Sequence, residues 1–578
     1  EVRLNNAGND FTGDLIVRVL GSNASTMVNQ GNPANPGVTA FEVGGAGATP
    51  ITPFGTGDLV IQRGMARYRR ANNATSATIN QDIRFGAAGY ADLSLDNRNT
   101  TGGTTTWTAG LTRENFGGLV VSYASGQLGD PGNNSRFFIT GQAVTDMVSP
   151  FIIVGDGTAS SRPRFAQYTA DGLGRVILAT SSVTAAVIDP LGLNNGTEHV
   201  QIRDGSRGST ITLGQNIDVK SFSTWNTINR NNGSGFTSIT TRSGGLIITG
   251  ENNVTLQPDL FFIDNLNNPI EAVIWASAGQ NYNTGSRTVV TGSITADSLT
   301  KLGVLAKHND GGSGRSMLEL SGNNFINGAS RVSDGGLRIT NANGVKDHND
   351  IFVGEFADLF LDVNETIAGL SGGGRGTSLN IGNNATRTLT INVAANETFS
   401  SAMSIQDRDT NLGQRLALIK DGLGTQILTG DSTFTGLTTI NQGELIVHGS
   451  LAGDVSVLGG KLGGNGTIDG TVTIHGGATH DVGASPGSQQ VGAENWMSGG
   501  FFNVQINDFA GAAGQDPGWD LLIVETLLDI QATDANPFTK LTDAARALYN
   551  GQDPGADLWI AIAWAVRITV VFATLAGR

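Results

Sequence analysis

Short apolar runs with alternating polar residues recur along the whole chain. Val17 and Val19 flank one polar residue, and Leu389, Ile391 and Val393 repeat the pattern, which is the period of a strand with one buried face. The runs are bracketed by glycine, asparagine or aspartate, which suit tight corners. Helical periodicity is almost absent, and the best helix candidate is the short segment Thr542–Leu548. The pattern predicts an all-β chain.

A repeat of 17 residues orders these strands near the end of the chain. The segment Gly453–Gly460 matches Gly470–Gly477 position by position. The same spacing sets two further pairs over one another: Leu462 and Thr479, Gly466 and Gly483. One such unit cannot bury its apolar face alone, whereas stacked copies bury a continuous core, and this period is close to one turn of a β-solenoid. We predict a right-handed parallel β-helix over residues 1–480 and a β-rich capping module over residues 481–578.

The composition agrees with a chain of corners and short strands. Glycine accounts for 82 of 578 residues and charged residues for 15%, against typical shares of about 7% and about 25%. The net charge of -15 argues against nucleic acid or an anionic membrane as a partner, because both attract basic surfaces. The chain has no cysteine, which excludes disulfides, thiol catalysis and cysteine-ligated zinc.

A longer repeat lies on top of the short one. Residues 428–447 have a degenerate copy at residues 320–339, in which the glycine and apolar positions after the central glycine recur at identical intervals. Each copy carries a phenylalanine, and the opening of the chain carries a third copy. We expect these side chains to stack inside their coils: Phe434, Phe325 and Phe11.

This pattern, L-x-G-x-N-x-Y/F-T-G-x-T-x-(I/V)-x-x-G-x-L, resembles the autotransporter-associated β-strand repeat. That repeat occurs in large secreted and surface proteins of Gram-negative bacteria, notably planctomycete and verrucomicrobial ones. The resemblance covers residues 416–449 well, residues 318–341 more weakly and residues 1–20 marginally. It implies a parallel β-helix passenger that is extracellular or on the outer cell surface. It implies no catalysis in most cases, no cofactor and no specific ligand.

Two acidic and basic runs are the candidates for catalysis. Polysaccharide lyases and hydrolases built on a β-helix need two or three carboxylates, or carboxylates with arginine or lysine, on adjacent coils. Such groups occur in these runs: Arg203, Asp204 and Arg207, and Asp407, Arg408 and Asp409. The other interpretation, which we favour, is that they cap corners and pair at the surface, since no hydrolase, zinc-protease or phosphate-loop motif is present. We expect no enzymatic activity.

Candidate ligand-binding residues are sparse. The run Lys346–Asp350 includes Asp347, His348 and Asn349 without a metal-specific spacing, so isolated Asp and Asn corners leave Ca²⁺ as the one ion to consider. His475 and His480 are the closest pair of histidines, and we expect them to be solvated. One basic cluster surrounds Tyr68, and it suits an acidic polysaccharide, an acidic neighbouring subunit or an ordinary solvated face: Arg63, Arg67, Arg69 and Arg70.

The two ends of the chain suggest self-assembly. The chain opens in strand-like residues with no signal-peptide pattern, so an exported protein would be numbered as its mature form. The apolar segment Leu558–Ala576 suits packed terminal strands, a membrane or sorting segment, or a subunit interface. We predict that copies join into a fibre or surface layer, with a monomeric adhesin anchored to the outer membrane as the alternative. The expected interface residues are these: Val2, Leu4, Trp559, Trp564, Val570 and Phe572.

Overall fold

The computed structural model describes most of the chain between residues 2 and 531. The described residues are 2–4, 12–18, 40–45, 55–70, 77–86, 90–96, 104–123, 128, 135–155, 163–178, 187–188, 195–202, 209–231, 233, 235, 237–249, 253–276, 287–303, 317–333, 335–355, 357–381, 386–408, 413–483, 486–503, 505, 507–508 and 511–531. Within these ranges the chain is built of strands and turns, and no helix occurs. The predicted all-β parallel helix is confirmed. The helix candidate Thr542–Leu548 lies outside the described residues.

The chain divides into two compact units, described here one at a time. The first unit comprises Glu1–Gly344 with Val353–Asp358, and the second comprises Val345–Phe352 with Leu359–Arg578. Two strands fall where the units meet along the chain: β31 (Asp350–Val353) and β32 (Asp358–Leu361).

The first unit begins with a β-helical stretch whose strands stack in three columns. The columns are β1–β3–β4–β7–β10–β12, β2–β4–β6–β9 and β5–β8–β11, and a hairpin of β13 and β14 follows β12. The pairs in the columns are parallel, and the hairpin pairs are antiparallel. The strand bounds are β1 (Val2–Leu4), β2 (Leu15–Arg18), β3 (Ala40–Gly45), β4 (Leu59–Arg70), β5 (Ala77–Asn80), β6 (Ile83–Phe85), β7 (Tyr90–Asp96), β8 (Thr105–Ala109), β9 (Leu111–Arg113), β10 (Gly118–Tyr123), β11 (Ser135–Ile139), β12 (Ile152–Gly155), β13 (Arg164–Thr169) and β14 (Gly172–Arg175).

A second β-helical stretch completes the first unit, again in three columns. These are β15–β17–β19–β21–β24–β27–β30, β16–β18–β20–β23–β26–β29 and β20–β22–β25–β28. The strand bounds are β15 (Val187–Ile188), β16 (His199–Ile202), β17 (Thr210–Leu213), β18 (Ile217–Thr224), β19 (Thr227–Asn229), β20 (Ser238–Ile248), β21 (Val254–Leu256), β22 (Asp259–Phe262), β23 (Ala272–Ala276), β24 (Arg287–Val290), β25 (Ile294–Ala296), β26 (Leu299–Gly303), β27 (Met317–Leu320), β28 (Phe325–Ile326), β29 (Ser330–Val332) and β30 (Gly336–Ile339).

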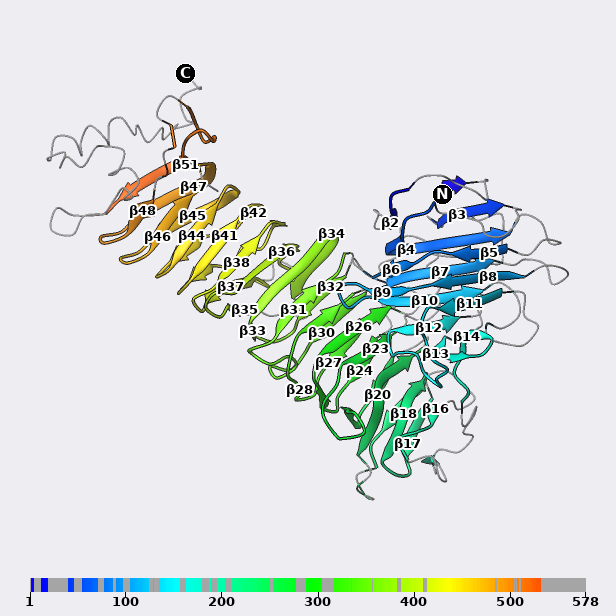
Figure 1. Cartoon of the computed structure of the whole chain (residues 1–578). Helices are drawn as coiled ribbons and strands as arrows, with labels where there is room; N and C mark the ends of the chain where they lie inside the picture. The colour runs from blue at the N-terminus through cyan, green and yellow to red at the C-terminus, as the bar shows by residue number, and fades with distance from the viewer. Residues whose placement is uncertain are drawn as a thin grey trace. The chain divides into compact units, whose positions relative to one another are not determined.

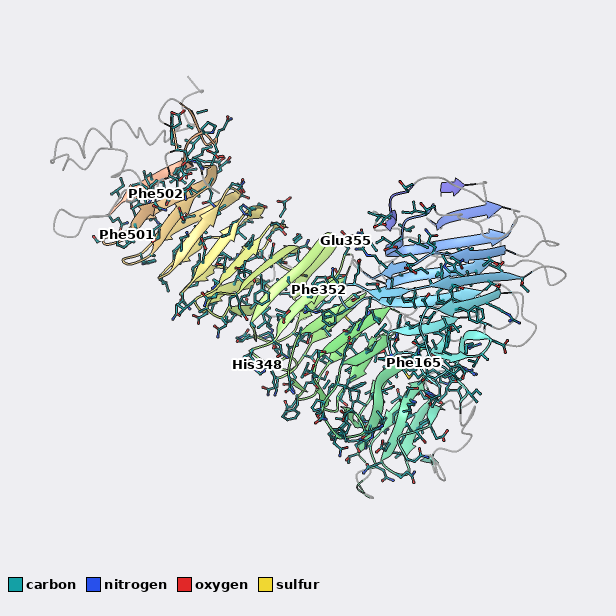
Figure 2. All side chains as sticks on the ribbon, viewed as in Figure 1. Phe165, His348, Phe352, Glu355, Phe501 and Phe502 are labelled. Atoms are coloured by element: carbon teal, nitrogen blue, oxygen red, sulfur yellow. The ribbon has the colours of Figure 1, made fainter. Side chains whose placement is uncertain are left out.

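The two stretches of the first unit pack together through a core of their own. Trp275 is fully buried there, and its indole N–H donates to the carbonyl of Pro150 at 2.8 Å. Close approach requires glycine on the facing strands. A Cβ at Gly118 would lie 2.5 Å from the Trp275 ring, and a Cβ at Gly245 would lie 2.6 Å from the ring of Phe165, which Figure 2 labels.

The second unit stacks its strands in the same three-column way. Figure 1 shows its arrows, green to orange, laid one on the next, in the columns β33–β35–β37–β40–β43–β45–β47–β51, β34–β36–β38–β41–β44–β46–β48 and β39–β42–β45. The bounds are β33 (Glu365–Ile367), β34 (Gly369–Ile381), β35 (Arg387–Asn392), β36 (Thr398–Ile405), β37 (Leu416–Asp421), β38 (Thr425–Leu428), β39 (Asp431–Ser432), β40 (Thr438–Ile440), β41 (Glu444–Val447), β42 (Ser450–Leu451), β43 (Val455–Val457), β44 (Lys461–Gly464), β45 (Thr467–Ile474), β46 (Thr479–Val482), β47 (Ser488–Trp496), β48 (Phe501–Asn503), β49 (Ala512–Ala513), β50 (Gly518–Trp519) and β51 (Leu521–Ile530).

The 17-residue spacing is the register of the coils that join β40, β43 and β45 in this unit. Val455 pairs with Val472 and Val457 with Ile474, and all four side chains are buried. Each such side chain contributes about 1.5–3 kcal/mol on full burial, so stacked copies stabilise what one coil could not. Elsewhere the coils are longer, because loops extend the corners while the strands keep their pairing. Parallel pairing also continues to Ile530, and the boundary predicted near residue 480 stays a prediction.

One predicted pairing is wrong by a single residue. Leu462 pairs with His480, not with Thr479, and Gly464 pairs with Val482, so Gly466 does not lie over Gly483. The corner between Ile474 and Thr479 holds one residue more than the equivalent corner of the preceding coil. The extra residue advances the register and turns His480 into the core.

The phenylalanine prediction holds in one repeat copy and fails in another. Phe434 is fully buried, as expected, but Phe325 is 52% exposed. In the degenerate copy the phenylalanine comes one residue sooner after its glycine, and Ile326 occupies the inward position instead. Phe11 lies outside the described residues.

Candidate functional site

The predicted assembly residues are divided between described and undescribed parts of the chain. Val2 and Leu4 lie in β1, which pairs in parallel register with β3. Among the described strands β1 has this one neighbour, so no described strand pairs with its other edge. Four further predicted residues lie outside the described ranges: Trp559, Trp564, Val570 and Phe572. The apolar segment Leu558–Ala576 lies outside them as well.

The described part of the candidate catalytic runs is occupied with holding a corner. One carboxylate oxygen of Asp407 accepts a hydrogen bond from the backbone N–H of Leu416 at 2.7 Å. The other accepts from the backbone N–H and the hydroxyl of Thr435 at 2.8 and 2.7 Å. A carboxylate with three such donors is poorly placed to act as a base. The remaining members, apart from Arg408, lie outside the described residues: Arg203, Asp204, Arg207 and Asp409.

The basic cluster around Tyr68 belongs to the long strand β4. The register places Arg67 beside Glu42 of β3, and Arg69 beside Asp96 of β7. The positions of Arg63 and Arg70 lie on the same strand, and the side chains of the cluster lie outside the described residues. The pairing positions put acidic residues next to the basic ones along the sheet.

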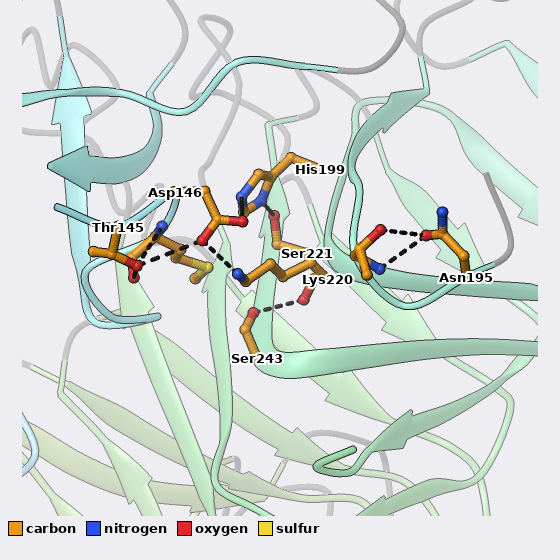
Figure 3. Close-up of polar contacts among 9 residues, drawn as sticks. Thr145, Asp146, Asn195, His199, Lys220, Ser221 and Ser243 are labelled. Carbon is orange, nitrogen blue, oxygen red and sulfur yellow. Dashed lines mark hydrogen bonds and ion pairs between the residues drawn. The ribbon is translucent and has the colours of Figure 1, made fainter. Parts of the chain in front are cut away.

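Sequence reasoning missed a polar cluster in the first unit, shown in Figure 3. Loop residue Asp146 lies against β16 and β18, where the Nζ of Lys220 donates to its Oδ1 at 2.5 Å. His199 has its Nε2 3.9 Å from Asp146 Oδ2, and its Nδ1 is 2.7 Å from the Ser221 hydroxyl. Burial lowers the pKa of His199. Burial alone would raise the pKa of Asp146, but the hydrogen bond and charge of Lys220, together with the charge of His199, lower it.

This serine, histidine and aspartate set is not arranged for nucleophilic catalysis. The Ser221 side chain is only 3% exposed, so a substrate carbonyl could not reach its hydroxyl. The serine is also on Nδ1 and the carboxylate on the Nε2 side, the reverse of the arrangement in serine hydrolases. The cluster instead ties the loop carrying Asp146 to the face of β18.

The segment around Asp347 adjoins a buried carboxyl group that the sequence did not reveal. Asp347 and His348 are exposed, and Asn349 is buried. The backbone carbonyl of Asn349 accepts from the N–H of Ala368, which stacks this segment on the coil of β33. On that strand Glu365 is 2% exposed, and no described residue donates a well-formed hydrogen bond to either of its carboxyl oxygens. Burial, and then the charge of Asp347, raise the pKa of Glu365 to about 9.

The expectation that His480 is solvated is wrong. His480 is 0% exposed and lies between Glu494 and Gln489 of β47, whereas His475 stays partly exposed and is 3.1 Å from the Ser456 hydroxyl. The sequence did contain the signal. The corner before Thr479 has one residue more than the same corner of the preceding coil, and this extra residue places His480 on the inward face of its strand.

The described residues offer neither a metal-binding group nor a membrane-spanning helix. No group of three or more histidine, cysteine, aspartate or glutamate side chains comes together in a way that could hold a metal ion. Within the same part of the chain, no helix is long and apolar enough to cross a bilayer.

Comparison with known families identifies one repeat in the chain. Residues 418–447 match the passenger-associated-transport-repeat family, which confirms the resemblance to an autotransporter passenger repeat over these residues. They run from β37 to the end of β41, one full coil and its flanking strands. No curated protein and no solved structure matches the chain.

Proposed function

We propose that this chain, which carries the passenger repeat at residues 418–447, is a secreted or outer-surface β-helix of a Gram-negative bacterium that acts as a structural or adhesive element. The repeat implies a passenger, and passengers with this repeat are exported. The stacked coils support a mechanical role, because their cores are lined along the chain by aliphatic side chains. Asp407, which the sequence offered for catalysis, is engaged in holding a corner.

The finer part of the proposal is assembly with copies of the same chain. The observation that carries it is the edge of β1 that no described strand occupies, since backbone groups on such an edge can accept a strand from another molecule. A head-to-tail contact of this kind does not close on itself and so produces fibres. The net charge of -15 disfavours a nucleic-acid partner, and an extracellular polysaccharide is the second partner class we consider.

Edge charging tests the assembly proposal. We expect the chain at micromolar concentration to sediment as concentration-dependent oligomers and to appear as fibres or sheets in negative stain. The double variant Val2→Lys/Leu4→Lys is expected to sediment as a monomer, because charges on an edge strand oppose strand addition. Arg3→Lys is the matched control and should assemble as the parent does, and a 1–550 truncation reports on the apolar end. A parent chain that stays monomeric at these concentrations rules the proposal out.

The absence of catalysis is tested with acidic polysaccharides. Incubation with pectin, alginate and other uronates is expected to give no new reducing ends and no unsaturated products. Asp407→Ala is expected to weaken the corner at Leu416 and Thr435 by about 1–3 kcal/mol, since two backbone donors lose their acceptor. Sustained turnover that Asp204→Ala or Asp409→Ala abolishes would show that the chain is an enzyme.

A further inference from the structure

A histidine and a glutamate form a closed charge pair inside one of the last coils of the second unit. His480 on β46 and Glu494 on β47 are both 0% exposed. The Nδ1 of His480 is 2.8 Å from Glu494 Oε1, which also accepts from the Trp496 indole N–H at 2.9 Å. The other ring nitrogen is 2.7 Å from Gln489 Oε1. The imidazole is thus held between two oxygen atoms in the buried core.

The orientation of the Gln489 amide follows from its second contact. Its Nε2 donates to the carbonyl of Gly463 at 3.4 Å, and its Oε1 faces His480. Both ring nitrogens of His480 therefore meet acceptors, and an imidazole satisfies two acceptors only when both nitrogens carry a proton. The geometry requires an imidazolium paired with the Glu494 carboxylate.

Aromatic and aliphatic side chains seal this pair from water. Phe502 of β48 meets the His480 ring edge-on at 5.8 Å and the Trp496 ring at 5.3 Å, while its neighbour Phe501 is 44% exposed; Figure 2 labels both phenylalanines. On the other side, Leu462 of β44 pairs with His480 in register. No described residue donates to Glu494 Oε2, so His480 and Trp496 supply its hydrogen bonds.

The other charged groups around the pair are engaged with one another. Lys461 of β44 forms ion pairs with Asp481 and with Glu444, the latter at 3.0 Å. Asp481 also accepts from Asn503 of β48 at 2.8 Å. Asp520 accepts from the backbone N–H groups of Gly487 and Gln505 at 2.9 and 2.6 Å. Among these described contacts none brings a second cation to Glu494.

We propose that the His480–Glu494 pair is a pH-sensitive latch that closes the coil formed by β46 and β47. Loss of the imidazolium proton turns one ring nitrogen into an acceptor that faces another acceptor. It also leaves the Glu494 carboxylate buried without a counter-ion, which is among the costlier states of a protein core. The protonated coil is closed, and the deprotonated coil opens more readily.

The direction of the pH dependence follows from the pKa of His480. Burial alone would lower this pKa, but Glu494, Gln489 and the charge of Asp481 together outweigh burial and raise the pKa above its usual value of about 6.5. Because the folded-state pKa is the higher one, the latch contributes fully below about pH 6.5 and is lost as the pH rises through the folded-state pKa. Because opening is linked to the release of a single proton, the opening equilibrium can change by at most tenfold per pH unit.

Hydrogen exchange on the full chain tests the latch. After correction for the pH dependence of the chemical exchange rate, peptides covering residues 478–483 and 488–496 are expected to open up to tenfold more per pH unit above about pH 6.5. Peptides covering residues 398–405, which contain no titratable side chain, serve as the internal reference. Glu494→Gln and His480→Gln should flatten the dependence in the first two segments, and His448→Gln, a substitution of a histidine on the outside of its coil, should leave it in place.

The result that overturns the latch is protection in residues 478–496 that is the same at pH 6 and pH 9. A loss of protection equal to that of the reference peptides overturns it too, because it would arise elsewhere in the unit. Should His480→Gln not fold, the profile of the parent chain and of Glu494→Gln still decides between these outcomes.

Discussion

Replacing Gly443 by alanine is expected to destabilise the coil of β41 by more than about 3 kcal/mol. Gly443 has φ +65°, a conformation that costs an L-residue about 1 kcal/mol or more. The larger part is steric: an added Cβ would lie 2.3 Å from the carbonyl oxygen of Gly422 and 2.4 Å from that of Gly424. These are backbone atoms of the adjacent coil, so the two coils would have to separate.

The same corner also contains a buried cation. The Nζ of Lys420 donates to the carbonyls of Asp421, Gly422 and Gln442 at 2.7, 2.9 and 3.3 Å, and the added Cβ would lie 2.8 Å from it. Burial lowers the pKa of Lys420 to about 8, so its ammonium depends on these carbonyls. Moving the coils apart would weaken these hydrogen bonds as well, which is why we expect the effect to exceed strain alone.

Gly477→Ala is the matched control for this prediction. Its φ is +87°, but an added Cβ would meet no atom within 4 Å. The substitution should therefore lower stability only through the unfavourable positive φ angle, by roughly 1 kcal/mol. The measurement is local hydrogen exchange with thermal unfolding by circular dichroism, because a stack of coils need not unfold in one step. Equal losses for the two variants would show that contact between the coils is not what requires glycine at residue 443.

The sequence predicts the coils well and the buried polar groups poorly, for one physical reason. Period-two alternation and glycine corners are local, so the pairing of Val455 with Val472 follows from spacing alone. Which face a polar residue takes depends on the length of the corner before it. One extra residue puts His480 inside, and one residue fewer before Phe325 turns that ring outward.

Groups joined across coils were beyond the reach of sequence reasoning. Asp146 meets Lys220 only because a loop of one stretch packs on a strand of another, and no local pattern links the two positions. Glu365 occupies an inward position of an ordinary strand pattern, where a carboxyl group is unexpected. The sequence could give the inward position but not that burial and Asp347 together raise the pKa of this carboxyl group.

Replacing Glu365 by glutamine is expected to stabilise the second unit at neutral and alkaline pH. The carboxyl group is buried, and burial and Asp347 raise its pKa to about 9, well above the usual 4.5. A carboxyl whose folded-state pKa is the higher one favours folding below about pH 4.5, and this contribution is lost as the pH rises toward 9. The loss is about 1.4 kcal/mol per pH unit at most, so the gain from removing the ionisable group grows with pH.

At pH 8 we expect Glu365→Gln to raise the local stability of residues 359–392 by roughly 2 kcal/mol or more, and to flatten its dependence on pH. Glu365→Leu should give a similarly flat dependence of stability on pH, since it also removes the ionisable group. Comparing the leucine and glutamine variants separates the effect of charge from that of hydrogen bonding. Glu397→Gln, at an exposed glutamate, is the control and should change neither quantity by more than about 0.5 kcal/mol. Hydrogen exchange between pH 5 and 9 provides the measurement. A Glu365→Gln chain that is weaker than the parent by the same amount at every pH would show that the carboxylate is stabilised by a partner, such as a bound cation, and would refute the prediction.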